Sequence, residues 1–205
     1  RDWEKNPSLL EVLEDFNEAM ARAGALLIHY RAHFVGKLAP RAAQIQRDFS
    51  GDREELTLSY QTVGTVRNPL GPTVSIYEDL RAHQDSHRRA ELEARSCLSG
   101  PHKDDLAAWI DGQPARQFAS QGQTRTAALS LKLAERELFE DDTGQWPVLL
   151  LDDVLSELDA RRQDFVLDRI TGGQVFITSC EAPAGEISRG KILHIHQGAL
   201  VDSPN

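Results

Sequence analysis

The sequence lacks the features of membrane-spanning, disulfide-stabilised and non-specific nucleic-acid-binding proteins. No apolar run approaches the roughly 20 residues that cross a bilayer, and no charged-then-apolar leader opens the chain. The two cysteines, Cys97 and Cys180, are far apart and form no CxxC pair, which predicts free thiols in a reducing cytoplasm. The 23 Lys and Arg residues against 32 Asp and Glu give a net charge of −9, which disfavours non-specific binding to nucleic acid.

A loop that cradles nucleotide phosphates is also missing from the sequence. The segment "GEISRGK" at 185–191 has the glycine and lysine spacing of such a loop, but Ile192 stands where Ser or Thr would coordinate a metal. The segment does not open the predicted fold, and no long helix follows it. We therefore interpret it as a chance match.

The first fifty residues show the periodicity of helices. Ser8 and Glu11 have the spacing of a capping box at a helix start. Two apolar stripes at helical spacing each predict one buried helix face: Leu9, Leu13, Phe16 and Met20, then Leu27, Tyr30, Phe34 and Leu38. Gly24 separates the two stripes, and Pro40 is expected to kink the second helix or to start a third. The segment predicts a helical arm.

Residues 51–119 predict strands and turns around one helix. "LTLSYQTV" at 56–63 alternates as a strand does, and residues 76–95 predict a charged, mostly exposed helix. Residues 96–118 predict strand, turn, strand and turn, with "DGQP" at 111–114 as a hairpin connection.

The second half of the sequence predicts an α/β unit with parallel strands. A helix is expected over 120–140, and "VLLL" at 148–151 predicts a strand buried on both faces. A helix over 159–170 and a second strand, "QVFITS" at 174–179, complete a strand–helix–strand unit. "KILHIHQGALV" at 191–201 predicts a terminal hairpin.

One short stretch, "SQGQTRT" at 120–126, opens the predicted helix in the second half. Ser120 and Gln123 have capping-box spacing, in which each side chain accepts a hydrogen bond from a backbone N–H of the other residue. Any stable helix can use such a cap. The stretch by itself therefore leaves two interpretations open, a helix cap or a phosphate sensor.

Two adjacent acids follow the first apolar strand. In a parallel α/β sheet, ligands bind beyond the carboxyl ends of the strands, where Asp152 and Asp153 would lie. Hydrated Mg²⁺ with nucleotide phosphates can offset their charge, the first acid holding the ion and the second orienting a water. The alternative is that the two acids cap the loop that follows.

Three strings together resemble the motifs of a known class of ATPases. "SQGQ", "VLLLDD" and "SELD" resemble the signature motif, the Walker B motif and the D-loop of ABC-type ATPases. "GPHKDDL", "SQGQTRTAALSLKLAE" and "LLLDDVLSELD" are similar, as whole strings, to the RecF family of bacterial recombination mediators, relatives of the SMC and Rad50 heads. The resemblance runs from the first helix to the last hairpin and is most specific from Ser99 to Asp159.

The resemblance implies a fold and a division of the chain. The fold class is α/β, part of an ABC-type P-loop ATPase head plus a helical lobe with a small antiparallel sheet. Residues 1–145 would form the helical lobe that ends in the signature helix, and residues 146–205 the C-terminal part of the ATPase core. Because no phosphate-binding loop is present, we expect half of each composite site and a chain that is inactive as an ATPase by itself.

The resemblance also implies roles for individual residues. Asp152 would hold Mg²⁺ through water and Asp153 would position the hydrolytic water. The signature helix would face the γ-phosphate of ATP held by another subunit, through Ser120, Gln121, Gly122, Gln123 and Arg125. Arg125 could instead pair with an acid on its own helix. The D-loop residues at the dimer interface would be Ser156, Leu158 and Asp159.

Two positions depart from the usual ABC pattern. Asp153 stands where many of these ATPases have Glu, and its shorter side chain would be consistent with slow turnover. Thr178 and Ser179 replace the histidine that often follows the last core strand, so a γ-phosphate contact there would be neutral and weaker.

Contacts to DNA or to partners have only weak sequence support. Arg88 and Arg89 form the one compact basic cluster. The resemblance places His102 and Lys103 beside the signature, where DNA or interface contact and simple loop stabilisation are both open.

The resemblance implies an ATP-dependent clamp that dimerises with ATP and Mg²⁺ on gapped DNA, at junctions of single- and double-stranded DNA. The partners would be RecO and RecR, with RecA loaded indirectly and no membrane involved, in the bacterial cytoplasm near the nucleoid. The competing hypothesis is a non-hydrolysing protein-interaction module, in which the stretch from Ser120 to Gln123 is only a cap. An SMC or Rad50-type head fragment is disfavoured, because the sequence has no sustained heptads.

Overall fold

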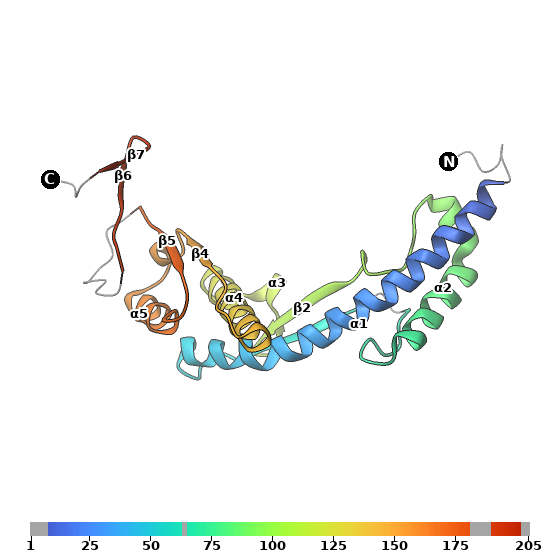
Figure 1. Cartoon of the computed structure of the whole chain (residues 1–205). Helices are drawn as coiled ribbons and strands as arrows, with labels where there is room; N and C mark the ends of the chain where they lie inside the picture. Colours follow the sequence, from blue (N-terminus) through green and yellow to red (C-terminus); the bar gives the residue numbers. More distant parts are fainter. Residues whose placement is uncertain (1–7, 63–64, 181–189, 202–205) are drawn as a thin grey trace. The chain divides into compact units, whose positions relative to one another are not determined.

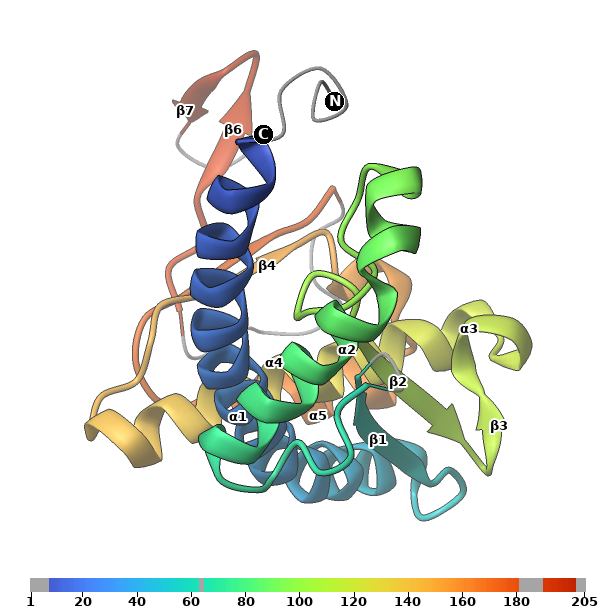
Figure 2. The same ribbon diagram turned by 90° about the vertical axis from the view of Figure 1, so that its right-hand side faces the viewer.

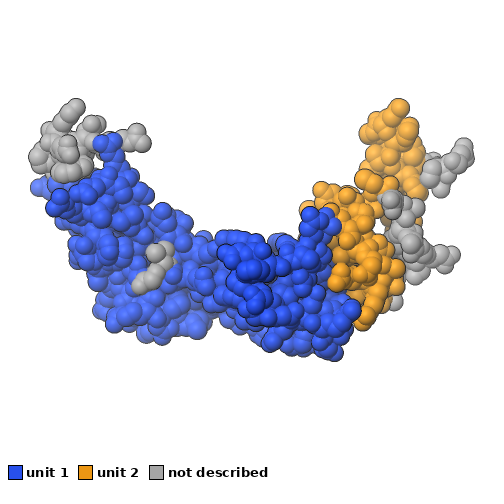
Figure 3. All heavy atoms as spheres, turned by 180° about the vertical axis from the view of Figure 1, so that it is seen from behind, with its two compact units in different colours: residues 1–146 blue, residues 147–205 orange. Residues whose placement is uncertain are grey.

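The computed structural model describes residues 8–62, 65–180 and 190–201, except for the side chain of Leu9. The chain divides into two compact units, residues 1–146 and residues 147–205, coloured separately in Figure 3. Most of the 185–191 segment, with the glycine and lysine spacing of a phosphate-binding loop, lies outside the described residues.

The first unit is organised around one long helix. Helix α1 (Leu9–Ser50) ends at Gly51, whose left-handed backbone (φ 65°) suits a glycine at a helix end. Helices α2 (Thr73–Ala94) and α4 (Gln121–Thr143) both pack against α1, and Figures 1 and 2 show α1 and α2 side by side. This arrangement confirms the expected helical lobe but joins its first fifty residues into one element.

A small antiparallel sheet completes the first unit. Its strand order is β1-β2-β3, with β1 at Leu56–Gln61, β2 at Asp105–Ile110 and β3 at Gln113–Pro114, and β1 also packs on α1. The predicted turn between β2 and β3 is confirmed, since Asp111 (φ 51°) and Gly112 (φ 75°) both have the positive φ of a tight hairpin turn. A short helix, α3 (Ala115–Phe118), leads from β3 towards α4.

The predicted break in α1 after Gly24 is wrong. Gly24 is buried within the helix, and a Cβ there would lie 3.2 Å from Cδ of Pro101. The glycine therefore allows close packing of the 96–104 loop on the helix. Pro40 also lies inside α1 and does not start a new helix. The predicted strand near residue 97 is wrong as well, because this segment forms the loop that packs on α1.

The apolar stripes predict the buried face of α1 only in part, since Leu38 is buried but the large aromatic residues of the stripes are exposed. Phe16 and Tyr30 are 68% and 63% exposed, whereas small side chains face α2. The core cluster of this region consists of Ala21, Ala25, Ile28, Val66, Ile76 and Leu80. Alanines on α1 let α2 approach closely, so helix packing and not side-chain size selects the buried face.

The second unit confirms the predicted parallel strands. Strands β4 (Leu149–Asp152) and β5 (Val175–Thr178) pair in parallel, and the 3₁₀ helix η1 (Leu155–Glu157) and helix α5 (Ala160–Arg169) connect them. The terminal hairpin is also confirmed, with β6 at His194–His196 and β7 at Ala199–Val201.

Burial of β4 on both faces is not found within the described residues. Leu149 and Leu151 are buried, but Leu150 is 71% exposed and its neighbour on β5, Phe176, is 50% exposed. The strand alternates because the described part of this chain covers only one face of the two-stranded sheet.

Two further expectations concern the chain as a whole. Cys97 and Cys180 are both free thiols, as predicted. Among the described residues, no helix combines the length and the apolar character needed to cross a bilayer.

Candidate nucleotide site

The signature stretch forms the predicted cap at the start of α4. The Ser120 side chain accepts a hydrogen bond of 3.2 Å from the Gln123 backbone N–H, and the Gln123 side chain accepts one of 3.0 Å from the Ser120 N–H. Ser120 has the extended backbone (φ −64°, ψ 162°) that an N-cap requires. The capping-box prediction is confirmed here.

The cap leaves part of the helix N-terminus available for an anion. The first N–H groups of a helix have no carbonyl partner within it, and the Ser120 side chain engages only that of Gln123. The N–H groups of Gln121 and Gly122 belong to this same first turn, at the positive end of the helix dipole. Gln121, Gly122 and Arg125 are exposed. The stretch can therefore act as a cap and present donors at the same time.

The two acids lie where the sequence predicts, at the carboxyl end of β4. Asp152 is the last residue of this strand and pairs with Thr178, the last residue of β5. Both acids are exposed at the edge formed by the two strand ends. The Thr178 hydroxyl donates a hydrogen bond of 2.5 Å to Oδ1 of Asp152.

Asp153 has a left-handed backbone (φ 53°), which is uncommon for a residue other than glycine. Its N–H points to Thr178, with the carbonyl oxygen at 3.1 Å and the hydroxyl oxygen at 3.0 Å. The Ser156 hydroxyl donates to Oδ1 of Asp153 at 2.7 Å. Both the backbone and the carboxylate of Asp153 are thus held by neighbouring residues.

The predicted D-loop residues form a compact link between η1 and α5. Leu158 is buried, and Asp159 caps α5 by accepting a hydrogen bond of 2.9 Å from the Arg162 N–H. The Gln163 side chain donates to the carbonyl oxygens of Leu155 and Leu158. The path of the chain after Asp153 is therefore set by local hydrogen bonds.

The oxygen donors at the end of β4 suit a hard cation. Mg²⁺ in proteins is commonly held by one or two carboxylates together with phosphate oxygens and water. Asp152 and Asp153 supply two carboxylates, and the described residues contain no cluster of three or more His, Cys, Asp or Glu that could hold a metal by themselves. The donor set therefore fits Mg²⁺ that arrives with a nucleotide.

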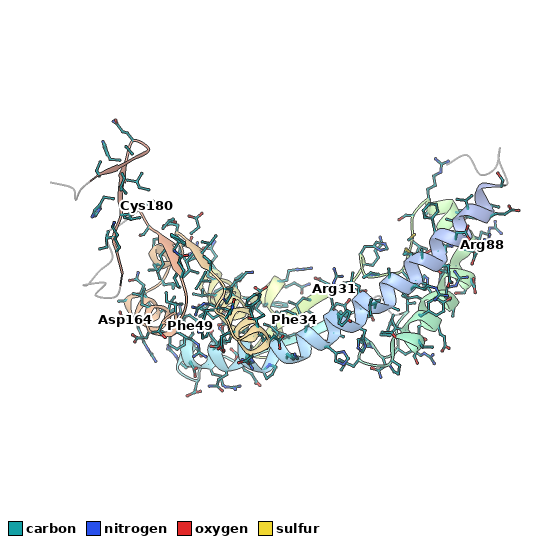
Figure 4. The ribbon with its side chains drawn as sticks, viewed as in Figure 1. Arg31, Phe34, Phe49, Arg88, Asp164 and Cys180 are labelled. Atoms are coloured by element: carbon teal, nitrogen blue, oxygen red, sulfur yellow. The ribbon has the colours of Figure 1, made fainter. Side chains whose placement is uncertain are left out.

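The predicted basic contacts have acidic neighbours. Arg88 on α2, labelled in Figure 4, has Nη1 4.0 Å from Glu14, and Nε of Arg89 lies 2.9 Å from Glu93. These pairs compete with a phosphate for the guanidinium groups, so DNA contact by the two arginines stays a prediction.

The loop with His102 and Lys103 is held on α1. Arg31, labelled in Figure 4, donates a hydrogen bond of 2.7 Å to the Pro101 carbonyl oxygen. A Cβ on Gly100 would lie 3.2 Å from the His102 ring, and the Lys103 N–H closes a turn onto the Gly100 carbonyl oxygen. His102 and Lys103 are both exposed, so loop stabilisation and contact with DNA or a partner both stay open for them.

No model of a protein family matches the chain. The chain is 40% identical over 164 residues to "DNA replication and repair protein RecF" of Symbiobacterium thermophilum, covering 80% of this chain and 44% of that protein. It is 37% identical to the protein of the same name from Bacillus subtilis, covering 95% and 52%.

Solved structures of RecF proteins have a fold similar to that of this chain. A RecF–ATP structure described as the recombination mediator protein of the RecFOR pathway has a TM-score of 0.78 and 35% identity, covering 93% of this chain. The chain is a homologue of RecF. It spans about half the length of the RecF proteins that it matches. A second RecF structure, with ATPrS, has the same TM-score of 0.78 and 34% identity.

The hydrogen bonds of Thr178 are the main feature of the candidate site that the sequence motifs did not predict. The sequence suggests only a phosphate contact for this residue, whereas its hydroxyl contacts both adjacent acids. The predicted parallel pairing of the two strands could have indicated this contact, because it places the last residues of the two strands side by side. The register between β4 and β5, which decides the partner, is not encoded in any motif.

Proposed function

We propose that this chain supplies the signature and Walker B parts of the ATP site in a RecF-type DNA repair ATPase. The observation that carries the proposal is the match over most of the chain to RecF proteins, including a RecF–ATP structure. Two observed features support the proposal: the hydrogen-bonded helix start at Ser120 and the two adjacent acids after β4. Such a site requires both groups of residues.

In the proposed assembly, α4 faces ATP held by a second subunit. Its free N–H groups and the hydroxyl proton of Ser120 would donate to the γ-phosphate, and Gly122 would let that phosphate approach the backbone. Arg125 would add a positive charge one turn into the helix. Since ATP would join the two subunits, binding and homodimerisation would be linked.

The acids after β4 would serve the metal and the water. Asp152 would hold Mg²⁺ through a water molecule, and the Mg²⁺ would neutralise phosphate charge when bound. Asp153 would accept a proton from, and orient, the hydrolytic water. Ser156, Leu158 and Asp159 would contact the partner subunit, so that a change in dimerisation reaches the carboxylate of Asp153 through Ser156.

The proposed biological role is based on the similarity of this chain to RecF proteins. We propose a cytoplasmic, nucleoid-associated clamp that closes on gapped DNA with ATP, acts with RecO and RecR to load RecA, and opens on slow hydrolysis. Residues 1–145 would form the helical lobe and residues 146–205 part of the ATPase core. Because the net charge is −9, DNA contact would depend on local groups such as Lys103 or on the rest of the assembly.

The test uses this chain alone and mixed with the P-loop half of a RecF protein. Binding of ATP and sedimentation are measured for each, with Asp152→Asn as the control for the metal. ATP-dependent assembly in the mixture, reduced by Asp152→Asn, is the expected result. Assembly that ignores ATP would contradict the proposal.

A protein-interaction module is the second candidate. The observation in its favour is that Ser120 and Gln123 already satisfy each other, so the stretch needs no ligand to be stable. Such a module would show no response to ATP in the mixture, whatever residue occupies position 152.

A further inference from the structure

The hydroxyl of Thr178 lies between the two acids that follow β4. It donates its proton to Oδ1 of Asp152 at 2.5 Å and accepts a hydrogen bond of 3.0 Å from the N–H of Asp153. These two bonds connect one side chain on β5 with the carboxylate of one acid and the backbone of the next. Thr178 is therefore part of the support of this pair of acids.

A threonine hydroxyl has one proton to donate. A phosphate oxygen accepts hydrogen bonds, so Thr178 could contact a γ-phosphate only by releasing Asp152. The bond to Asp152 is charge-assisted and stronger than a neutral hydrogen bond. The geometry therefore favours a role towards the acids over the role of γ-phosphate sensor that the sequence suggests for this position.

The backbone of Asp153 gives a second reason for this support. A left-handed backbone is strained for a residue other than glycine, so surrounding bonds must hold it in place. The carbonyl and the hydroxyl of Thr178 both accept from the Asp153 N–H. The hydroxyl thus fixes the direction in which Asp153 leaves the strand as well as the position of the Asp152 carboxylate.

We infer that Thr178 is a positioning residue for the magnesium site, which orients Asp152 and Asp153 and does not itself contact the nucleotide. This inference rests on the proposed function, because it assigns Asp152 to a hydrated Mg²⁺. Outer-sphere partners of metal-binding carboxylates are worth about 10- to 100-fold in metal affinity. Loss of the Thr178 hydroxyl should weaken Mg²⁺ binding at the lower end of this range, because Asp152 would hold the ion through water and not directly.

The experiment measures binding of ATP and of ADP to the mixed assembly as the Mg²⁺ concentration is varied. Thr178→Val removes the hydroxyl and keeps the β-branched shape that suits a strand. We expect it to raise the Mg²⁺ concentration for half-maximal binding by about tenfold for both nucleotides. Thr178→Ser, which keeps the hydroxyl, should restore the original value.

Two further variants keep the result interpretable. Thr178→Ala removes the hydroxyl without the extra bulk of valine and should show the same shift. Thr57→Val makes the same chemical change at an exposed position of β1 and should leave the Mg²⁺ dependence unchanged. Circular dichroism of each variant checks that the fold is intact.

Three results would overturn the inference. Thr178→Val could weaken ATP binding but not ADP binding at saturating Mg²⁺, which is the behaviour of a γ-phosphate sensor. Thr178→Ser could behave like Thr178→Val, which would show that the hydroxyl is irrelevant. Absence of Mg²⁺-dependent ATP binding in the unsubstituted assembly would overturn the proposed function itself, and is distinct from the other two results.

Discussion

Ser130 in the middle of α4 donates a hydrogen bond of 2.9 Å to Oε1 of Gln46 on α1, and both side chains are fully buried. The amide of Gln46 in turn donates to Glu54 at 2.6 Å, just beyond the end of α1. This polar chain lies within a largely apolar contact between the two helices. It fixes how α4 packs along α1, because a buried polar group tolerates few alternative positions.

Replacing Ser130 by Ala should destabilise the chain. The substitution leaves Oε1 of Gln46 buried without its donor, which costs about 1–3 kcal/mol. Urea denaturation measures the change in the free energy of unfolding. Ser86→Ala on α2 removes an exposed hydroxyl and should change that free energy by less than about 0.5 kcal/mol. Equal effects of the two substitutions would mean that the buried bond carries no net stability.

Two glycines of the same helix should respond in opposite directions to leucine. A Cβ on Gly24 would lie 3.2 Å from Pro101 and 3.4 Å from Leu80, whereas a Cβ on Gly36 meets nothing within 4 Å. Gly24→Leu should therefore lower the free energy of unfolding by about 1–3 kcal/mol through overpacking. Gly36→Leu should raise it by about 0.5–1 kcal/mol through helix propensity. Thermal unfolding of both variants checks the difference in sign.

Stability should depend on the ionisation of Tyr60 at alkaline pH. Burial, followed by the hydrogen bond from the Tyr60 hydroxyl to the Asp104 carboxylate, raises the pKa of Tyr60 above the usual tyrosine value. The folded state thus prefers the neutral phenol. The neutral Tyr60 phenol contributes fully to the stability of the folded state below the tyrosine pKa of the unfolded state, about 10. This stabilisation is lost as the pH rises towards the pKa of Tyr60 in the folded state.

The measurement for Tyr60 compares denaturation curves on either side of about pH 10. The unsubstituted chain should lose stability more steeply with rising pH than Tyr60→Phe, which has no phenol to ionise. Tyr30→Phe, at an exposed ring, serves as the matched control. Parallel pH profiles for the unsubstituted chain and Tyr60→Phe would contradict the prediction.

Substitutions of Ser120 should separate the cap from the phosphate contact. Ser120→Ala removes the cap and should cost about 1 kcal/mol of stability. Ser120→Arg should in addition abolish ATP-driven assembly with the P-loop half, because its bulk would occupy the position of the phosphate. Sedimentation with and without ATP measures the assembly. If Ser120→Arg still assembles with ATP, α4 does not face the nucleotide.

Local sequence signals predicted structure well where the cause is local. The turn at Asp111 and Gly112 and the capping box at Ser120 and Gln123 are confirmed, because each depends on residues within four positions of one another. The same capping spacing at Ser8 and Glu11 failed. Ser8 has a helical backbone (φ −63°, ψ −20°) and makes no capping hydrogen bond through its side chain, so the spacing alone does not create a cap.

The long-range features were less predictable. Gly24 looks like a helix break in the sequence, yet it is the point at which Pro101 approaches α1. Phe16 and Tyr30 look like core residues, yet Ala21, Ala25 and Ile28 are the α1 residues in the core cluster with α2. In both cases the deciding contact comes from a segment far away in the sequence, and no local pattern records it.

Local signals in the sequence were enough to predict the elements that carry the candidate site: a capped helix, an apolar strand ending in two acids, and a second strand parallel to the first. Capping, strand burial and chain connection act over short distances, and the RecF resemblance added the order of the motifs. The side chains that support the two acids could be found only from the folded chain. Thr178 meets Asp152 and Asp153 because the β4–β5 register brings together residues separated by 26 and 25 positions, and that register depends on packing across the whole sheet.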